Sequence, residues 1–172
     1  VYYTIMPELP EVQTTVNGIN AHTKGLEIED VWTNYKSAFH AKSDNIKNPK
    51  YFKIFRKEII GAKIVNASRR GKNILIHLSN GKTVLVHMKM TGHMMYGAYK
   101  KLPKKDHQGE WWRPKAHDEF LSDPFNRFIH LVFTFSNGKH LVLSDMRRFA
   151  KTTLIDSHKI DESLHLSAHG PE

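Results

Sequence analysis

Cysteine is absent from the 172 residues of this sequence. Disulfide bonds, a thiol nucleophile and a cysteine-ligated zinc site within the chain are therefore excluded. Long apolar runs are also absent, since none approaches the roughly 20 residues of a membrane-spanning helix. Residues 1–5 lack the basic start and apolar core of a signal peptide. We therefore expect a soluble cytoplasmic protein with no membrane partner.

Acidic residues are few relative to basic ones. The chain has 17 Asp and Glu against 26 Lys and Arg, which gives a formal net charge of +9. Such a surplus favours a polyanionic partner, although the charge alone is equally compatible with a basic protein whose charge serves solubility. The length fits one well-packed domain rather than two.

The spacing of apolar residues predicts one helix followed by a mainly antiparallel β structure. Leu9, Val12, Val16 and Ile19 recur at the three-and-four spacing of an amphipathic helix, which we expect over Glu8–Asn20. Beyond this helix the sequence changes to short β-prone runs. The expected strands are Leu26–Tyr35, Phe52–Ile60, Lys63–Ser68, Asn73–Leu78, Thr83–Met88 and Lys151–Ile155.

Two Asn-Gly pairs, within 79–82 and 136–139, predict tight hairpins, because both central residues of such a turn need a positive φ. The second hairpin is expected to pair Phe128–Phe135 with His140–Ser144. Between Gly97 and Pro124 the sequence shows no periodicity, and we expect a long loop or insertion that either contacts a ligand or is mobile.

Five short strings carry the functional information. The first is Met6-Pro7-Glu8-Leu9-Pro10-Glu11-Val12, which alone is compatible with ordinary helix capping, because proline pre-sets φ and carboxylates favour the positive helix end. The other four follow in order: Arg69-Arg70-Gly71-Lys72, His87-Met88-Lys89-Met90-Thr91-Gly92, Asp145-Met146-Arg147-Arg148-Phe149 and His169-Gly170-Pro171-Glu172. Together they resemble the formamidopyrimidine-DNA glycosylase and endonuclease VIII family.

The resemblance spans the chain from Met6 to its end, with three departures. The family usually has Pro at the position of Met146, Gly at that of Ala150 and Leu at that of His169. These departures put the loop geometry in question rather than the family.

The resemblance implies a two-layer antiparallel β-sandwich with an amino-terminal α-helix and a short carboxyl-terminal helix, expected over Ser157–Leu166. It also implies base-excision repair by a bifunctional DNA glycosylase and abasic-site lyase that removes oxidised purines such as 8-oxoguanine from damaged double-stranded DNA. Residues 6–172 would be the amino-terminal catalytic domain, without the helix–two-turn–helix and zinc-finger parts of the family. We expect a monomer, associated with a bacterial nucleoid, with no cofactor in this chain and zinc only in the missing carboxyl-terminal finger.

Three residues are the expected catalytic groups. The resemblance implies that the amine of Pro7 attacks C1′ of the damaged nucleoside, and an α-amino group with a pKa of about 8 keeps a neutral fraction for Schiff-base formation. Glu8 resembles the general acid/base that acts on the ribose ring oxygen. Lys72 matches a lysine important for lesion processing, the alternative being a solvated lysine at a turn.

Met90, Arg147 and Phe149 match the residues that the family inserts into the duplex to fill the gap left by an everted nucleotide. The alternative is core packing for Met90 and Phe149 and a surface ion pair for Arg147. Further candidates in the same strings are Glu11, Arg70, His87 and Arg148. His165 and His169 have a chelating spacing, but no third ligand is evident, and we expect no metal site.

The amino terminus makes activity conditional. Five residues precede Met6, and in the chain as written the nitrogen of Pro7 is a tertiary amide that cannot form an imine. We expect residues 1–5 to be an extension ahead of the natural start at Met6, whose removal exposes Pro7. The alternatives are a non-catalytic DNA-binding relative or inactive fragment with a blocked Pro7, and a basic β-domain that binds protein or RNA.

Overall fold

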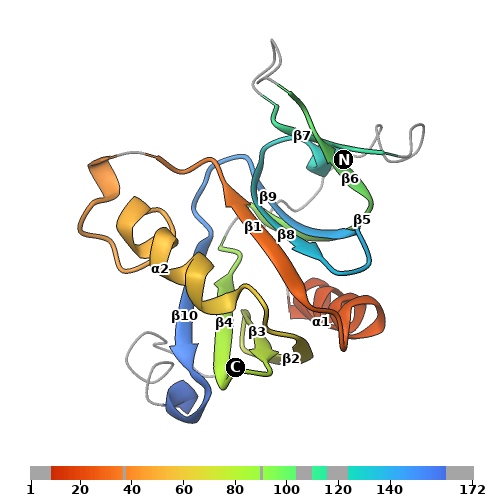
Figure 1. Cartoon of the computed structure of the whole chain (residues 1–172), viewed down its shortest axis with the longest axis vertical. Coiled ribbons are helices and arrows are strands. Elements are labelled where there is room, and N and C mark those ends of the chain that lie inside the picture. Colours follow the sequence, from red (N-terminus) through yellow and green to blue (C-terminus); the bar gives the residue numbers. More distant parts are fainter. Residues whose placement is uncertain (1–8, 37, 90, 104–109, 116–123, 162–172) are drawn as a thin grey trace.

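A computed structural model describes residues 9–36, 38–89, 91–103, 110–115 and 124–161. Within them, two four-stranded antiparallel sheets enclose one apolar core, as predicted (Figure 1). The first sheet has the order β1 (Ile28–Thr33), β8 (Ile129–Phe135), β9 (His140–Asp145) and β5 (Gly92–Gly97). The second has the order β10 (Lys151–Asp156), β4 (Lys82–His87), β3 (Asn73–Leu78) and β2 (Ile64–Arg70).

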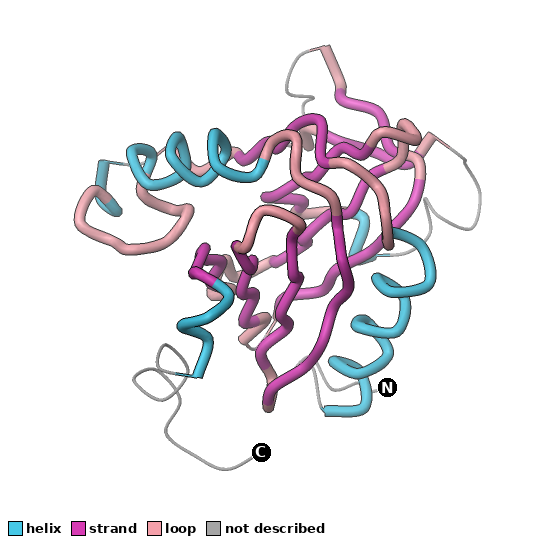
Figure 2. The backbone as a smooth tube through the Cα atoms, turned by 60° about the horizontal axis from the view of Figure 1, so that its bottom comes forward, coloured by secondary structure: helices cyan, strands magenta, loops and turns pink. Residues whose placement is uncertain are grey.

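Two helices lie on opposite sides of the strands (Figure 2). Helix α1 (Leu9–Thr23), predicted from its apolar spacing, buries that face against the edge strands β2 and β5. Helix α2 (Pro49–Ile59) contacts β1, and its Tyr51 hydroxyl accepts a hydrogen bond from the backbone of Leu154 in β10 at 3.0 Å. The helices thus cover strand edges that would otherwise offer unpaired backbone groups. Neither is long and apolar enough to cross a membrane.

The strand predicted at Phe52–Ile60 is wrong, because this segment belongs to α2. Asn48 accepts a hydrogen bond from the backbone nitrogen of Lys50 at 3.0 Å and so caps the helix start. Phe55 and Ile59, one helical turn apart, are buried in the core. Aromatic and β-branched residues suggested a strand, but their spacing is helical and packing against the sheets decides the outcome.

Both predicted hairpins are present, with a different turn from the one expected. Only Gly81 and Gly138 adopt a positive φ, +81° in each case, whereas Asn80 and Asn137 do not. Each asparagine side chain instead accepts a hydrogen bond from the backbone of the second residue after it. This is the geometry of a three-residue hairpin loop that ends in a left-handed glycine.

The segment predicted as a long loop or insertion at 97–124 contains a two-stranded ribbon, so the loop alternative is wrong for its described part. Strands β6 (Tyr99–Lys101) and β7 (Trp112–Pro114) pair with each other. Tyr99 and Trp112 are buried against Val132 and Val142 of β8 and β9. The first sheet is therefore covered on both faces, which explains why every residue of β9 is buried.

Several short elements were not predicted from the sequence. Strand β5 escaped prediction, as did two 3₁₀ helices, η1 (Ala38–His40) and η2 (Pro124–Asn126). The helix expected over Ser157–Leu166 begins as the 3₁₀ helix η3 (Ser157–Lys159). The rest of that segment lies largely outside the described residues.

The carboxylate of Asp145, at the end of β9, is fully buried and accepts three hydrogen bonds. The Thr91 hydroxyl and the Arg147 backbone nitrogen, the latter at 3.1 Å, both donate to Oδ1. The backbone nitrogen of Ala150 donates to Oδ2 at 2.7 Å. This one side chain therefore ties the segment before β5 to the loop between β9 and β10.

His130, in β8, supports the same junction from within the first sheet. Its Nε2 donates to the backbone oxygen of Asp145 at 2.9 Å, and its Nδ1 lies 2.9 Å from the side-chain amide of Asn34. Burial, together with the nearby Arg148 guanidinium, lowers the pKa of His130 to about 4. The imidazole is therefore neutral at neutral pH.

Asp145→Ala should lower the free energy of unfolding by about 3 kcal/mol, because two buried donors and one part-buried donor lose their acceptor. Urea denaturation measures the loss. The matched control is Asp30→Ala, which breaks an exposed 2.6 Å ion pair with Arg56 and should cost less than about 1 kcal/mol. Equal losses in the two variants would contradict the role assigned to Asp145.

The pKa of His130 predicts a loss of stability in acid. The unfolded histidine binds its proton near pH 6.5, whereas the folded one does so near pH 4. The unfolded state therefore holds more protons between these values, and the free energy of unfolding falls by up to about 3 kcal/mol as the pH drops through this window. In His130→Gln the difference in stability between pH 7 and pH 4.5 should shrink, and an unchanged difference would refute the assignment.

Candidate nucleic-acid interface

Basic residues gather at one end of the second sheet. Asn73, His87 and Lys151 occupy a single row across β3, β4 and β10. Lys72 immediately precedes this row, in the β2–β3 turn, and Lys89 follows it. Burial lowers the pKa of His87, and the positive charges of Lys89 and Lys72 lower it further. The predicted site residues Lys72 and His87 are thus brought together.

Lys47, which precedes α2, adds a further cation to this end. Its ammonium donates a hydrogen bond to the backbone oxygen of Arg148 and lies 5.8 Å from the centre of the Tyr35 ring. Burial lowers the pKa of Lys47, and Lys89, Arg148 and Lys151 also lower it. We call the group Lys47, Lys72, Lys89 and Lys151 the basic edge. Sequence reasoning missed Lys47, because no motif surrounds it.

The basic edge has few carboxylates to neutralise it. Between described residues, its one ion pair joins Lys151 to Asp44 at 3.6 Å, and Asp44 is 88% exposed. An exposed pair of this kind contributes little and exchanges readily with another anion. The edge is therefore suited to phosphate groups of a nucleic acid.

The β9–β10 loop, residues 146–149, presents exposed apolar and cationic side chains beside this edge. Met146 is 55% and Phe149 47% exposed, and the guanidinium of Arg147 lies 6.0 Å from the centre of the Phe149 ring. Arg148 has a φ of +59°, a left-handed conformation that is costly for a residue other than glycine. Core packing, the alternative reading of Phe149, does not fit its exposure.

The β4–β5 loop, residues 88–91, is tied to the β9–β10 loop through Thr91 and Asp145. Gly92 closes this loop, because its backbone nitrogen donates to the Met88 oxygen at 2.9 Å and a Cβ at Gly92 would lie 2.6 Å from that oxygen. Met90 lies outside the described residues.

The start of α1 is held against the β2–β3 turn. Nε of Arg69 donates to the side chain of Gln13 at 3.1 Å, and the Arg69 guanidinium also donates to the backbone oxygen of Gly71 at 3.0 Å. Pro7 and Glu8, which precede α1, lie outside the described residues. Helix α1 begins at Leu9, directly after Glu8 in the sequence, and is fixed to the turn that carries Lys72.

Two other predicted residues have positions that fit a structural role. Glu11 is exposed in the first turn of α1, where a carboxylate favours the positive end of the helix. Arg70 forms an ion pair with Asp161, which follows β10 in the chain. In the described ranges no group of three or more histidine and carboxylate side chains could hold a metal, and His165 and His169 fall outside them.

Comparison with known proteins places the chain in a family. Residues 6–152 match the family model of the formamidopyrimidine-DNA glycosylase N-terminal domain. The chain is 32% identical over 168 residues to formamidopyrimidine-DNA glycosylase of Desulforamulus reducens, covering 97% of this chain and 50% of that protein. The protein of the same name from Pelotomaculum thermopropionicum is 33% identical over 156 residues, covering 91% and 46%. The chain thus spans about half the length of the curated relatives it matches.

Solved structures show the same fold. Lactococcus lactis Fpg (MutM), in a complex with DNA containing N7-benzyl-Fapy-dG, has a TM-score of 0.69 at 22% identity, with 96% of this chain and 49% of that chain covered. A MutM complex with DNA containing carbocyclic 8-oxo-G has a TM-score of 0.69 at 22% identity, with 96% and 51% covered. By the match of its residues 6–152, this chain belongs to the formamidopyrimidine-DNA glycosylase family and contains the amino-terminal domain of that family.

Proposed function

We propose that this protein is a base-excision DNA glycosylase and abasic-site lyase that removes oxidised purines from double-stranded DNA. The observation that carries the proposal is the hydrogen bond from Thr91 to Asp145. This bond joins the β4–β5 and β9–β10 loops, which hold the three expected insertion residues, directly beside the basic edge. One surface can therefore bind the phosphates and enter the duplex.

The first step is eversion of the damaged nucleotide. Unstacking a base costs a few kcal/mol, which groups inserted into the vacated space can offset. Phe149 and Arg147 suit this task, since both are exposed and lie against each other. Neither contact requires a particular base, so the insertion serves any sequence around the lesion.

The second step is attack by the amine of Pro7, freed by removal of Met6 and any residues before it. The nitrogen forms a bond to C1′ as the glycosidic bond breaks, the released base takes up a proton, and the nitrogen then loses its own proton. Its lone pair forms an iminium (the protonated Schiff base) while the C1′–O4′ bond breaks and Glu8 supplies a proton to O4′. Loss of a C2′ proton expels the 3′ phosphate, and water hydrolyses the iminium to release the amine of Pro7.

The position of α1 supports these roles. Pro7 and Glu8 directly precede α1 in the sequence, so the chemistry proposed for them belongs at the start of this helix. The Gln13–Arg69 hydrogen bond fixes this helix end beside the β2–β3 turn. Lys72 in that turn is therefore well placed to hold a phosphate next to the reacting sugar.

Borohydride trapping tests the covalent step. Protein that begins at Pro7 should become linked to duplex DNA containing 8-oxoguanine, because borohydride reduces the imine to a stable amine. A matched preparation that retains residues 1–6 should not be trapped, since its Pro7 nitrogen is an amide. Lesion binding without a crosslink by the protein that begins at Pro7 would favour the non-catalytic DNA-binding alternative.

Glu8→Gln, examined by excision and by borohydride trapping, distinguishes the proton transfer assigned to Glu8 from the nucleophilic attack assigned to Pro7. Loss of general acid catalysis should slow excision of 8-oxoguanine by roughly 10²-fold or more. Trapping on DNA with a ready-made abasic site should fall much less, because that sugar already has a free aldehyde in equilibrium. Equal losses on the two substrates would argue against the role of Glu8.

Phe149→Ala tests insertion into the duplex. We expect excision to slow by about tenfold or more, the equivalent of losing roughly 1.4 kcal/mol of compensation for unstacking. Folding stability should change by less than about 0.5 kcal/mol, because the ring is 47% exposed. Ile54→Ala, at a 63% exposed position of α2, is the control and should retain the full rate.

A further inference from the structure

A second arginine–phenylalanine pair lies next to the β9–β10 loop. The guanidinium of Arg127 stands 5.3 Å from the centre of the Phe128 ring, and this ring is 39% exposed. The pair repeats the features of Arg147 and Phe149, a partly exposed ring with a guanidinium beside it. Neither Arg127 nor Phe128 belongs to the five strings that resemble the glycosylase family.

The backbone of Phe128 is strained, and the surrounding structure keeps it so. Its φ is +60°, which is a clear outlier for a bulky aromatic residue. The Phe128 oxygen accepts a hydrogen bond from the Asp145 backbone at 3.0 Å, and the Arg127 oxygen accepts one from the Ser144 hydroxyl at 2.6 Å. Strain fixed in this way, at an exposed ring, is typical of a functional contact.

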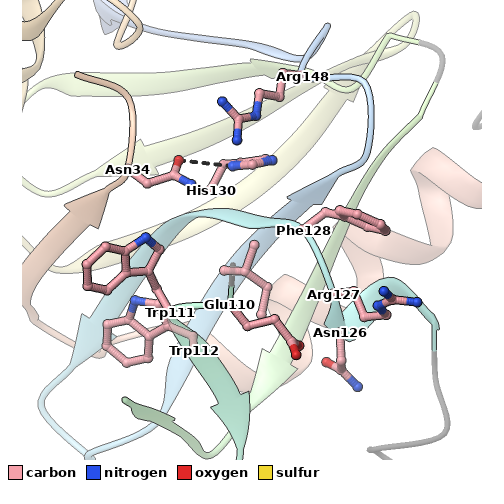
Figure 3. Close-up of a pocket in the computed structure, with 10 residues that line it drawn as sticks. Asn34, Glu110, Trp111, Trp112, Asn126, Arg127, Phe128, His130 and Arg148 are labelled. Atoms are coloured by element: carbon pink, nitrogen blue, oxygen red, sulfur yellow. Dashed lines mark hydrogen bonds between the residues drawn. The ribbon is translucent and has the colours of Figure 1, made fainter. Parts of the chain in front are cut away.

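The ring has open space beside it. Phe128 and Arg148 line the same pocket, of about 210 Å³, which also includes Trp111 and His130 (Figure 3). The Phe128 ring points away from the tryptophan side of this pocket. Its volume is below the range of about 300–1,000 Å³ that is usual for drug-sized ligands. A pocket of this size can accommodate the edge of one flat ring system but not a larger molecule.

Phe128 and Lys72 lie at different ends of the β9–β10 loop, Phe128 beside its start and Lys72 near its end. This loop leaves the first sheet at Asp145, which is bonded to Phe128, and enters the second sheet at Lys151. Lys151 shares its row with His87 and with Asn73, the neighbour of Lys72. A duplex that straddles the loop would present the damaged strand to the Lys72 end and the opposite strand to the Phe128 end.

We propose that the exposed face of Phe128, with Arg127 beside it, stacks on the unpaired nucleobase of the strand opposite the everted nucleotide. The inference rests on the proposed function, because it takes the β9–β10 loop as the segment inserted into the duplex. An aromatic ring and a guanidinium stack on any base, so the contact holds the orphaned base without reading its identity. The pocket between Phe128 and Arg148 gives that base room beside the inserted loop.

Phe128→Gly provides the decisive variant. Glycine adopts a φ of +60° without strain, so the substitution should leave the melting temperature unchanged or raise it. The probe is a duplex with a tetrahydrofuran abasic-site analogue opposite 2-aminopurine, which needs no catalysis to bind. We expect its affinity to fall roughly 5- to 160-fold, the range for one lost base–aromatic stack, and the 2-aminopurine quenching expected with the unaltered protein to be lost.

Phe125→Ala is the matched control. Phe125 is 42% exposed, three positions before Phe128, and stacks on His93 at 3.7 Å between ring centres, so its loss should leave affinity and quenching unchanged. Unaltered affinity in Phe128→Gly, or a lower melting temperature as the sole effect, would overturn the proposal. Borohydride trapping of lesion DNA by the unaltered protein tests the proposed glycosylase and lyase function separately, because trapping depends on the Pro7 amine and not on the contact proposed for Phe128.

Discussion

The buried carboxylate of Asp145 is the constraint on which the rest of the candidate site depends. It accepts hydrogen bonds from a side chain and two backbone groups, rather than pairing with a cation. Hydrogen bonds to a buried carboxylate are directional and strong, so they fix both loops in one arrangement. Between described residues the carboxylate forms no ion pair with a lysine of the basic edge, although its charge opposes the lowering of the Lys47 pKa by burial.

The sequence predicted those parts of the fold that depend on local chemistry. The Asn-Gly pairs located both hairpins, and the apolar spacing located α1. Helix α2 was not predicted, because its aromatic and β-branched composition favours a strand, although Asn48 followed by Pro49 is a helix-start signal. The ribbon of β6 and β7 is held by packing of Tyr99 and Trp112 on a distant sheet, for which a single sequence gives no periodic signal.

Some residues of the candidate site could likewise be predicted from local sequence, whereas others could not. The quoted strings nominated Lys72, His87, Arg147 and Phe149, and the structure places them around one loop junction. Lys47 meets Arg148 across 101 positions of sequence, a contact that no local pattern encodes. Phe128 could have been noticed by its Arg-Phe pairing, which repeats the Arg-Phe of the fourth string, but its left-handed backbone becomes visible only in three dimensions.

The ribbon of β6 and β7 changes the mechanical setting of the loop that enters the duplex. By covering the outer face of β8 and β9, it turns an outer sheet into the middle layer of three. Strands in such a layer open only with the whole domain, so their ends are the stiffest supports that the fold offers. The β9–β10 loop begins at one of these strand ends, so a force that the stacked bases exert on the loop is transmitted to a strand buried on both faces.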